Sequence, residues 1–170
     1  MRFFFGFHLQ KNSPPFSQVL GVLKIKRGPN SLVHAGDLGL KENLVFFKKL
    51  CFNYVSVFGT MTLFSLITQI ILYKSRALLF KIKKVTFKLM HIPNYLTPDS
   101  DVVIFGHTHN FEQQYTNNTL FINPGEVCAR NKNLTECVLL EIKEDKYIIE
   151  YNYKKPESNT WETKVYEYEK

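Results

Sequence analysis

The sequence predicts a two-sheet α/β sandwich, an α/β fold in which short buried strands end in residues that can bind metal. One observation is the apolar run Val102–Phe105, which has the length of a strand and leads into Gly106-His107-Thr108-His109. A second is the run Ser31–Ala35, which leads in the same way into Gly36-Asp37. Short apolar runs bounded by glycine fit buried parallel strands, and the loops at the carboxyl edge of such sheets carry functional groups. Both runs are therefore expected to deliver polar side chains to one edge.

Two further strand-like runs end in a histidine. Phe3–Phe7 precedes His8, and Phe87–Met90 precedes His91. A single histidine in such a place is more often structural than a ligand, but here the same position recurs after several strands. We therefore expect the strand exits after residues 34, 90 and 106 to face one another.

Periodicity and turn residues predict the remaining elements. A helix is expected over Lys41–Leu50, with its apolar side chains packed on a sheet. Asn117-Asn118 is a hairpin turn between strands at 112–115 and 120–122, and Glu144-Asp145 separates alternating strands at 135–143 and 147–153. The tail 154–170 is either a final edge strand or frayed.

Composition fits one domain. The chain has 170 residues, of which 45% are hydrophobic, which is enough for a core of its own, so residues 1–170 are predicted to form a single domain. The net charge of +7 suits a phosphate-bearing substrate, but a lysine-rich composition produces the same charge, and no nucleic-acid-binding motif is present. A solvated strand edge is expected for one cluster of lysines, Lys81, Lys83, Lys84 and Lys88.

The cysteines and the apolar segments bear on localisation. Cys51, Cys128 and Cys137 are odd in number and are not spaced as in a zinc ribbon, which favours a reducing cytoplasm. No signal peptide is expected, because the apolar run at the start stops at His8. The uncharged segment 54–73 has the length needed to cross a bilayer, but its threonines, serine and glutamine argue against a membrane span.

The polar residues at the strand exits form a candidate metal site with several imidazoles and one carboxylate. Such a set suits Mn, with Ni, Fe and Zn as alternatives, rather than an all-oxygen Ca site. The candidate ligands are His8, Asp37, His91, His107 and His109.

Three motifs in this order resemble the calcineurin-like metallophosphoesterases, and most closely the YfcE-type phosphodiesterases. They are Gly36-Asp37, Gly106-His107-Thr108-His109 and the segment Leu120–Glu126, which contains Asn123-Pro124-Gly125. The resemblance implies a dinuclear site in a metallo-dependent phosphatase fold, with Asp37 and His107 in catalytic positions. It also implies that Asp37 bridges two ions, that His8 and His109 serve the first ion, and that His91 and His107 serve the second.

The chain departs from the family pattern at two ligand positions. The first family motif is Asp-x-His, and here Gly6 stands in the aspartate position of Gly6-Phe7-His8. The third motif begins Gly-Asn, whereas this chain reads Gly59-Thr60-Met61-Thr62. Each ion would thus lose one protein ligand, which lowers affinity but still leaves three ligands and an open position.

One hypothesis for the second departure is a shift of reading frame. Deleting one base from codons for Gly-Asn-Asn-Asp can yield Gly-Thr-Met-Thr, the residues at 59–62, and a second shift before Lys81 would restore the frame. Segments 1–30 and 59–80 are the atypical parts of the predicted domain. Resequencing the gene in independent isolates tests the hypothesis, because an intact frame through 59–80 would contradict it.

Two classes of function follow from the resemblance. The first is a metal-dependent phosphoesterase that hydrolyses a small phosphodiester substrate through a metal-bridged hydroxide. The second is a non-catalytic binding scaffold, as in the retromer subunit Vps29, or an inactive degenerate homologue. The two missing ligands favour the second class, and the retained histidines and Asp37 favour the first. A homo-oligomer is left open.

Overall fold

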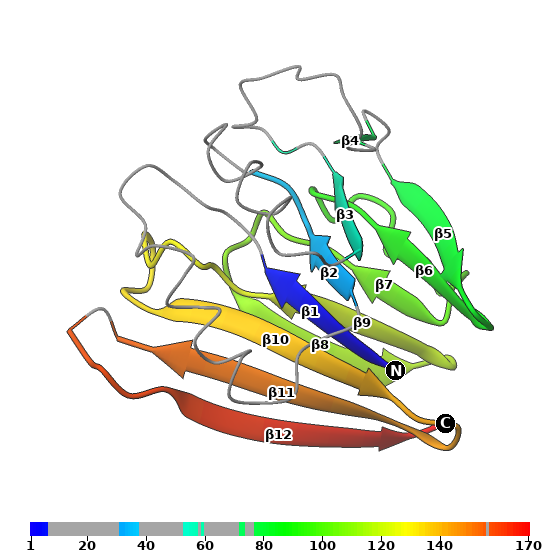
Figure 1. Cartoon of the computed structure of the whole chain (residues 1–170). Helices are drawn as coiled ribbons and strands as arrows, with labels where there is room; N and C mark the ends of the chain where they lie inside the picture. The colour runs from blue at the N-terminus through cyan, green and yellow to red at the C-terminus, as the bar shows by residue number, and fades with distance from the viewer. Residues whose placement is uncertain (7–30, 38–52, 58, 60–71, 74–76, 156) are drawn as a thin grey trace.

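The computed structural model describes residues 1–6, 31–37, 53–57, 59, 72–73, 77–155 and 157–170. Within these residues the chain forms two β-sheets that pack face to face (Figure 1). Aromatic and β-branched residues are frequent in the strands, as suits a pleated and half-buried surface.

The larger sheet has seven strands in the order β12-β11-β10-β1-β2-β3-β4. Its centre is parallel, because β1 pairs with β2, β2 with β3, and β3 with β4 in the same direction. The C-terminal strands add to β1 as an antiparallel meander. The strands are β1 (Arg2–Gly6), β2 (Ser31–His34), β3 (Asn53–Val57), β4 (Leu72–Tyr73), β10 (Thr135–Ile142), β11 (Lys146–Lys154) and β12 (Glu162–Glu169).

The smaller sheet has five strands in the order β5-β6-β7-β9-β8. Its three central strands run parallel, and an antiparallel strand closes each edge. The strands are β5 (Leu78–Ile82), β6 (Val85–Leu89), β7 (Val102–Ile104), β8 (Phe111–Thr116) and β9 (Thr119–Pro124).

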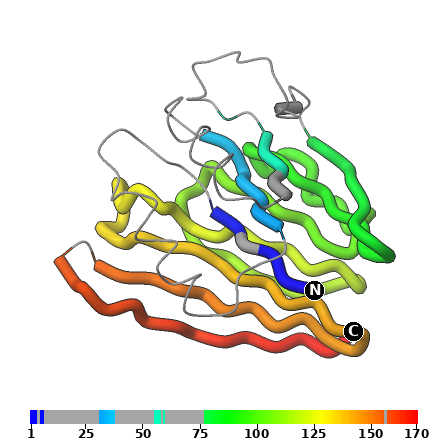
Figure 2. The backbone as a smooth tube through the Cα atoms, in the orientation of Figure 1, coloured from blue at the N-terminus to red at the C-terminus, as the bar shows by residue number. Residues whose placement is uncertain are grey.

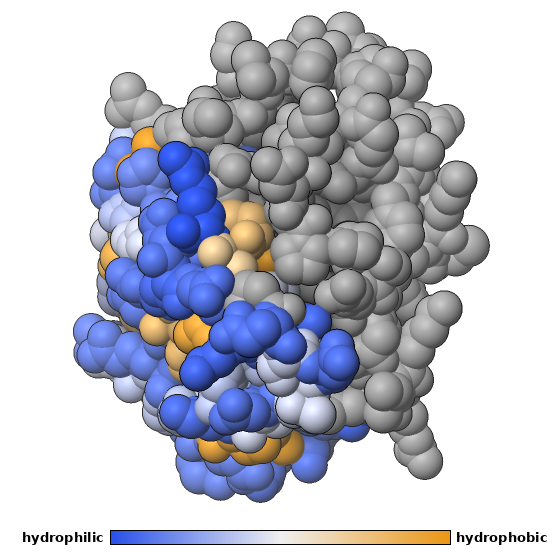
Figure 3. Space-filling model, turned by 90° about the vertical axis from the view of Figure 1, so that its left-hand side faces the viewer, coloured by the Kyte–Doolittle hydropathy of each residue, from blue (hydrophilic) through white to orange (hydrophobic). Residues whose placement is uncertain are grey.

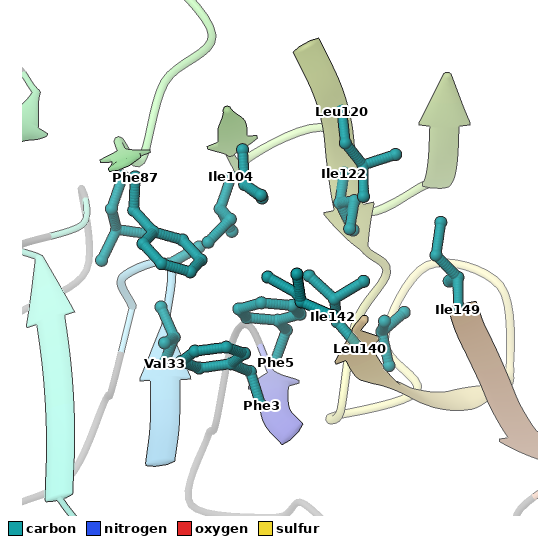
Figure 4. Close-up of a cluster of buried hydrophobic side chains, with 14 of the residues drawn as sticks. Phe3, Phe5, Val33, Phe87, Ile104, Leu120, Ile122, Leu140, Ile142 and Ile149 are labelled. Carbon is teal, nitrogen blue, oxygen red and sulfur yellow. The ribbon is translucent and has the colours of Figure 1, made fainter. Parts of the chain in front are cut away.

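The main hydrophobic core lies between the two sheets. Phe3 and Phe5 of β1 face Phe87 of β6, with the ring centroids of Phe3 and Phe87 5.0 Å apart (Figure 4). Ile104 of β7 and Ile122 of β9 complete this part of the core, and all five side chains are fully buried. This shared core fixes the two sheets relative to each other, and therefore fixes the strand ends that carry the polar residues.

Both ends of the chain are tied to the turn region between β10 and β11 (Figure 2). The amino group of Met1 donates to the carbonyl of Ile142 at 2.9 Å, and the amide of Lys170 donates to the carbonyl of Asp145 at 2.9 Å. Residues 162–169 form an ordered edge strand, β12. Of the two alternatives for the tail, the edge strand is therefore the correct one.

The predicted hairpins are present. Asn117 and Asn118 both adopt left-handed backbone angles, φ 50° and 56°, between β8 and β9, as a tight hairpin turn with two such residues requires. The antiparallel pair β10 and β11 is the hairpin predicted around Glu144 and Asp145.

One lysine prediction is wrong. Lys81, Lys83 and Lys84 are exposed at the β5–β6 hairpin, but Lys88 is only 4% exposed. Its ammonium group lies 2.5 Å from a carboxylate oxygen of Asp99 and donates to the hydroxyl of Thr97 at 2.7 Å. The long aliphatic stem lets the lysine pack in the sheet while its charge pairs with the following loop.

Several sequence predictions fall outside the described residues. These are the helix at 41–50, the ligand His8, the departure at Thr60, and most of the atypical segments 1–30 and 59–80. In the part of the chain that the structure describes, no helix is long and apolar enough to span a membrane. The prediction of a single domain concerns the whole chain and stays a prediction.

The face at the left-hand side of Figure 1 is mainly polar where it is described. Figure 3 shows mostly hydrophilic residues there, with smaller hydrophobic groups between them. The strands β1 and β9 both run toward this side of the molecule (Figure 1), so the loop that follows β9 lies here.

Candidate metal centre

Polar residues follow the parallel strands of both sheets at the edge where those strands end. Asp37 follows β2, His91 follows β6, and His107 and His109 follow β7. Asp37, His107 and His109 all have left-handed backbone angles, with φ between 58° and 69°. Non-glycine residues rarely adopt this conformation, and where they do it is often at functional sites.

Three of these side chains meet directly across the two sheets. Nε2 of His91 lies 3.4 Å from Oδ2 of Asp37 and 3.3 Å from Nδ1 of His107. Asp37 and His91 are buried, with 2% and 5% of their surface exposed. The predicted convergence of the exits after residues 34, 90 and 106 is therefore observed, with His91 between the other two side chains.

A backbone carbonyl fixes the orientation of His91. Its Nδ1 lies 2.9 Å from the carbonyl oxygen of Ala35, which can only accept a hydrogen bond, so Nδ1 carries the proton. In the neutral ring Nε2 is then the nitrogen with a lone pair, and it is the one turned toward Asp37 and His107. Histidine ligands in metal sites are commonly held in this way through their second nitrogen.

Two glycines allow this close approach. A Cβ atom on Gly36, where φ is +100°, would lie 2.7 Å from Nδ1 of His91, and one on Gly59 would lie 2.0 Å from Oδ1 of Asp37. Neither distance is possible between real atoms, so the strand exits can pack together only with glycine at both positions. Gly36 belongs to the motif that the sequence singled out, and Gly59 begins the altered third motif.

His109 has a different partner. Its Nδ1 forms a short contact with Oε2 of Glu126, which follows β9. The loop carrying His109 is tied down by Asn123, whose amide donates to the carbonyl of Gly106 at 3.3 Å and to the hydroxyl of Thr108 at 2.8 Å. Asn123 is fully buried, and its bond to Gly106 forms away from solvent.

Glu126 is a buried carboxylate whose oxygens are all engaged. The backbone amides of Asn131 and Lys132 donate to Oε1 at 2.6 and 3.2 Å. Burial by itself favours the neutral carboxyl, but hydrogen bonds from His109 and these amides outweigh it and hold the pKa of Glu126 below its ordinary value. The side chain is therefore charged at neutral pH although it is inaccessible to water.

The thiol of Cys128 completes a second group of potential ligands. Its Sγ lies 3.7 Å from Oε2 of Glu126, and the ligand atoms of His109, Glu126 and Cys128 all lie within 4.8 Å of one another. Burial and then the charge of Glu126 raise the pKa of the thiol to about 12. An ion would need about 2 Å to each nitrogen or oxygen. Nδ1 of His109 and Oε2 of Glu126 are too close together for an ion to lie between them, so they are hydrogen-bond partners.

The structure thus brings together Asp37, His91 and His107 and places His109 on the same loop as His107, while His8 lies outside the described residues. Imidazole nitrogens beside a buried carboxylate fit a borderline divalent cation such as Mn, Fe, Ni or Zn. Sequence reasoning missed Glu126 as a site residue. A signal existed in the sequence, because Glu126 is a carboxylate at the end of the motif Leu120–Glu126, but its partner could not be read from the spacing.

This geometry agrees with comparison to known proteins. The family model of the calcineurin-like phosphoesterase superfamily domain matches residues 8–145, so the chain belongs to the calcineurin-like phosphoesterase superfamily. The predicted fold is thereby confirmed, and the YfcE-type resemblance is supported by a predicted phosphoesterase of Streptococcus pneumoniae and an archaeal phosphodiesterase among the similar structures. No match was found among curated proteins.

Solved structures with the same fold are of two kinds. Vacuolar protein sorting 29 from Cryptosporidium parvum is 18% identical with a TM-score of 0.78, covering 99% of this chain and 98% of that one. Vps29 of Entamoeba histolytica complexed with zinc is 18% identical with a TM-score of 0.75, covering 98% and 99%. The archaeal phosphodiesterase is 16% identical with a TM-score of 0.69, covering 98% and 100%. At these identities the likeness shows the fold alone.

Proposed function

We propose that this chain is a metal-dependent phosphoesterase that hydrolyses small phosphodiesters. The observation that carries the proposal is the orientation of His91, whose Nδ1 is held by the carbonyl of Ala35 while Nε2 faces both Asp37 and His107. In the neutral ring this arrangement turns the lone pair of Nε2 toward the carboxylate of Asp37, and two acceptors facing each other in this way are unfavourable unless a cation lies between them. A cation between these groups accounts for the arrangement.

Each residue then has a defined task. Asp37, His91 and His107 would hold one cation, and Asp37, His109 and His8 would hold the other. Bound divalent ions would polarise the phosphoryl oxygens and lower the pKa of an attacking water. The predicted ligands include no general acid to protonate the leaving group, so diesters with acidic leaving groups are the expected substrates. Mn is the proposed metal, with Ni, Fe and Zn as alternatives.

The experiment is a Mn titration of the purified chain that follows both thermal unfolding and hydrolysis of an aryl phosphodiester. A ligand that binds only the native state stabilises it by about 2.7 kcal/mol at a concentration of 100 times Kd. We expect a Mn-dependent rise in the melting temperature and Mn-dependent hydrolysis. The matched variant is His107→Asn, because asparagine tolerates the φ of 69° at this position but does not reproduce the imidazole.

The second candidate function is that of a non-catalytic binding scaffold. Gly6 has no side chain at a position where the family has a metal-binding aspartate, and two Vps29 proteins are among the similar structures. A parent protein that neither melts higher nor hydrolyses the diester with Mn would contradict the phosphoesterase and favour the scaffold. A cytoplasmic location belongs to both proposals, and formation of a homo-oligomer stays open to measurement by sedimentation.

A further inference from the structure

Glu126 is a buried charge that the family motifs do not assign to any task. It is fully buried at the end of β9, and both carboxylate oxygens are used. One oxygen accepts hydrogen bonds from two backbone amides, and the other contacts Nδ1 of His109. Burying a carboxylate is costly unless its partners are well placed. This cost indicates that the contact with His109 is a specific feature of the chain.

The contact determines which nitrogen of His109 can bind a metal. A charged carboxylate can only accept, so Nδ1 of His109 carries a proton, and in the neutral ring Nε2 has the lone pair. The ring of His91 is held in the same state, with Nδ1 donating to the carbonyl of Ala35. Two histidines that follow different strands are thus both prepared to use Nε2.

Glu126 is itself held rigidly by a second buried glutamate. The amide of Glu126 donates to a carboxylate oxygen of Glu136 at 3.1 Å, and the amide of Glu136 donates to the carbonyl of Glu126 at 2.8 Å. Glu136 is paired with the ammonium group of Lys132 at 2.8 Å and accepts a hydrogen bond from the hydroxyl of Tyr151. The carboxylate that contacts His109 therefore has little freedom to move.

We propose that Glu126 is a positioning residue that holds His109 with Nε2 presented to the metal, and that it supplies through the imidazole part of the negative charge missing at Gly6. The inference rests on the proposed function. A carboxylate behind a histidine ligand fixes the ring and makes the ligand more basic, and losing such a partner typically costs about 10–100-fold in metal affinity or activity. Glu126 does not touch the metal or the substrate in this role.

The test compares the full chain with Glu126→Gln and with the control Glu112→Gln. Glu112 is exposed and accepts a hydrogen bond from the hydroxyl of Thr108 at 3.1 Å, so its carboxylate contacts the same loop but not the imidazole of His109. Calorimetric Mn titration gives the affinity of each protein. Nitrogen-15 NMR of the metal-free proteins reports the tautomer of His109, which a purely structural role of Glu126 would leave unchanged once the variant is folded.

We expect Glu126→Gln to bind Mn about 10–100-fold more weakly and to show His109 as a mixture of tautomers, with Glu112→Gln like the parent. Equal Mn affinity of parent and Glu126→Gln, or an unchanged tautomer, would overturn the inference. A parent that binds no Mn would overturn the proposed function, and the tautomer measurement would still decide whether Glu126 positions His109. If Glu126→Gln fails to fold, Glu126→Asp, which keeps the charge but is one methylene too short, undergoes the same two measurements.

Discussion

Nε2 of His91 lies 3.4 Å from Oδ2 of Asp37, although the two residues follow strands of different sheets. The core between the sheets brings these strand ends together, and Gly36 and Gly59 leave the space that the contact needs. The packing of the two sheets therefore places the polar residues of the candidate site. Predictions about the site can therefore be made from both its ligands and its glycines.

Gly59→Ala should damage the site by displacing Asp37. The added methyl group would lie 2.0 Å from Oδ1 and 2.6 Å from the carboxyl carbon of Asp37, so the carboxylate must move. Overpacking of this kind typically costs about 1–3 kcal/mol of stability. We expect Mn affinity to fall at least about tenfold as well, measured by calorimetry.

A core variant separates the two effects of Gly59→Ala. Leu120→Ala removes a fully buried side chain and should cost about 2–5 kcal/mol while leaving Mn affinity unchanged. If Gly59→Ala binds Mn as tightly as Leu120→Ala does, the close approach of Gly59 to Asp37 has no part in metal binding.

Asp37→Asn should abolish the stabilisation by Mn without unfolding the chain. Asparagine tolerates the φ of 58° at this position, so the substitution removes the charge and leaves the backbone unstrained. We expect the melting temperature without metal to stay close to that of the parent, and the rise with Mn to disappear. Asp145→Asn, at an exposed turn, is the control and should keep the full rise. A Mn response that survives in Asp37→Asn would rule out Asp37 as the bridging ligand.

The sequence predicted the strands around the site well, because several of them are marked locally. Val102–Ile104 and Ser31–His34 are short apolar runs ended by glycine-containing loops, and Asn117-Asn118 favours left-handed angles in both turn positions. These signals need only neighbouring residues. The structure therefore agrees with the predictions at these elements.

Features that depend on which strands become neighbours could not be predicted in the same way. Glu126 meets His109 because β7 and β9 are parallel neighbours, with Ile104 opposite Ile122, so that the chain leaves both strands at one place. Lys88 is buried because the following loop supplies Asp99 as its partner. Neither contact is visible in the spacing of residues along the chain.

Stability should decrease as the pH rises above about 9, because two buried phenols and one partly buried thiol resist ionisation. Burial and then the charge of Asp101 raise the pKa of Tyr147 to about 12 from an ordinary value of 10.0. Burial and then the charge of Glu126 raise the pKa of the Cys128 thiol to about 12 from 9.0. Burial, followed by the hydrogen bond to Glu136, also raises the pKa of Tyr151.

The sign follows from proton binding. Between about pH 9 and pH 12 the folded chain binds more protons than the unfolded chain, so the free energy of unfolding falls as the pH increases. Urea unfolding at about pH 8 and about pH 10.5, which lie on either side of the ordinary pKa values of a thiol and a phenol, measures the change. Tyr147→Phe should reduce the loss of stability between the two pH values, whereas Tyr95→Phe, at an exposed position, should not. Equal losses in both variants would show that Tyr147 does not contribute.

Gly6→Asp should strengthen metal binding by restoring a carboxylate at the first altered position. Gly6 ends β1 and is the parallel partner of His34 on β2, the strand that leads to Asp37. A second carboxylate near Asp37 repels it when no metal is bound, so we expect Gly6→Asp to melt below the parent without Mn. With Mn it should melt higher and bind the ion about 10–100-fold more tightly, and aryl phosphodiester hydrolysis should rise.

The control is Gly6→Asn, whose side chain has nearly the same size as that of aspartate without the charge. It should show neither the lower melting temperature without Mn nor the higher one with Mn. Adding Thr60→Asn, outside the described residues, should increase the gain further. A folded Gly6→Asp protein with the parent's Mn affinity and hydrolysis rate would show that the missing carboxylate is not what limits this site.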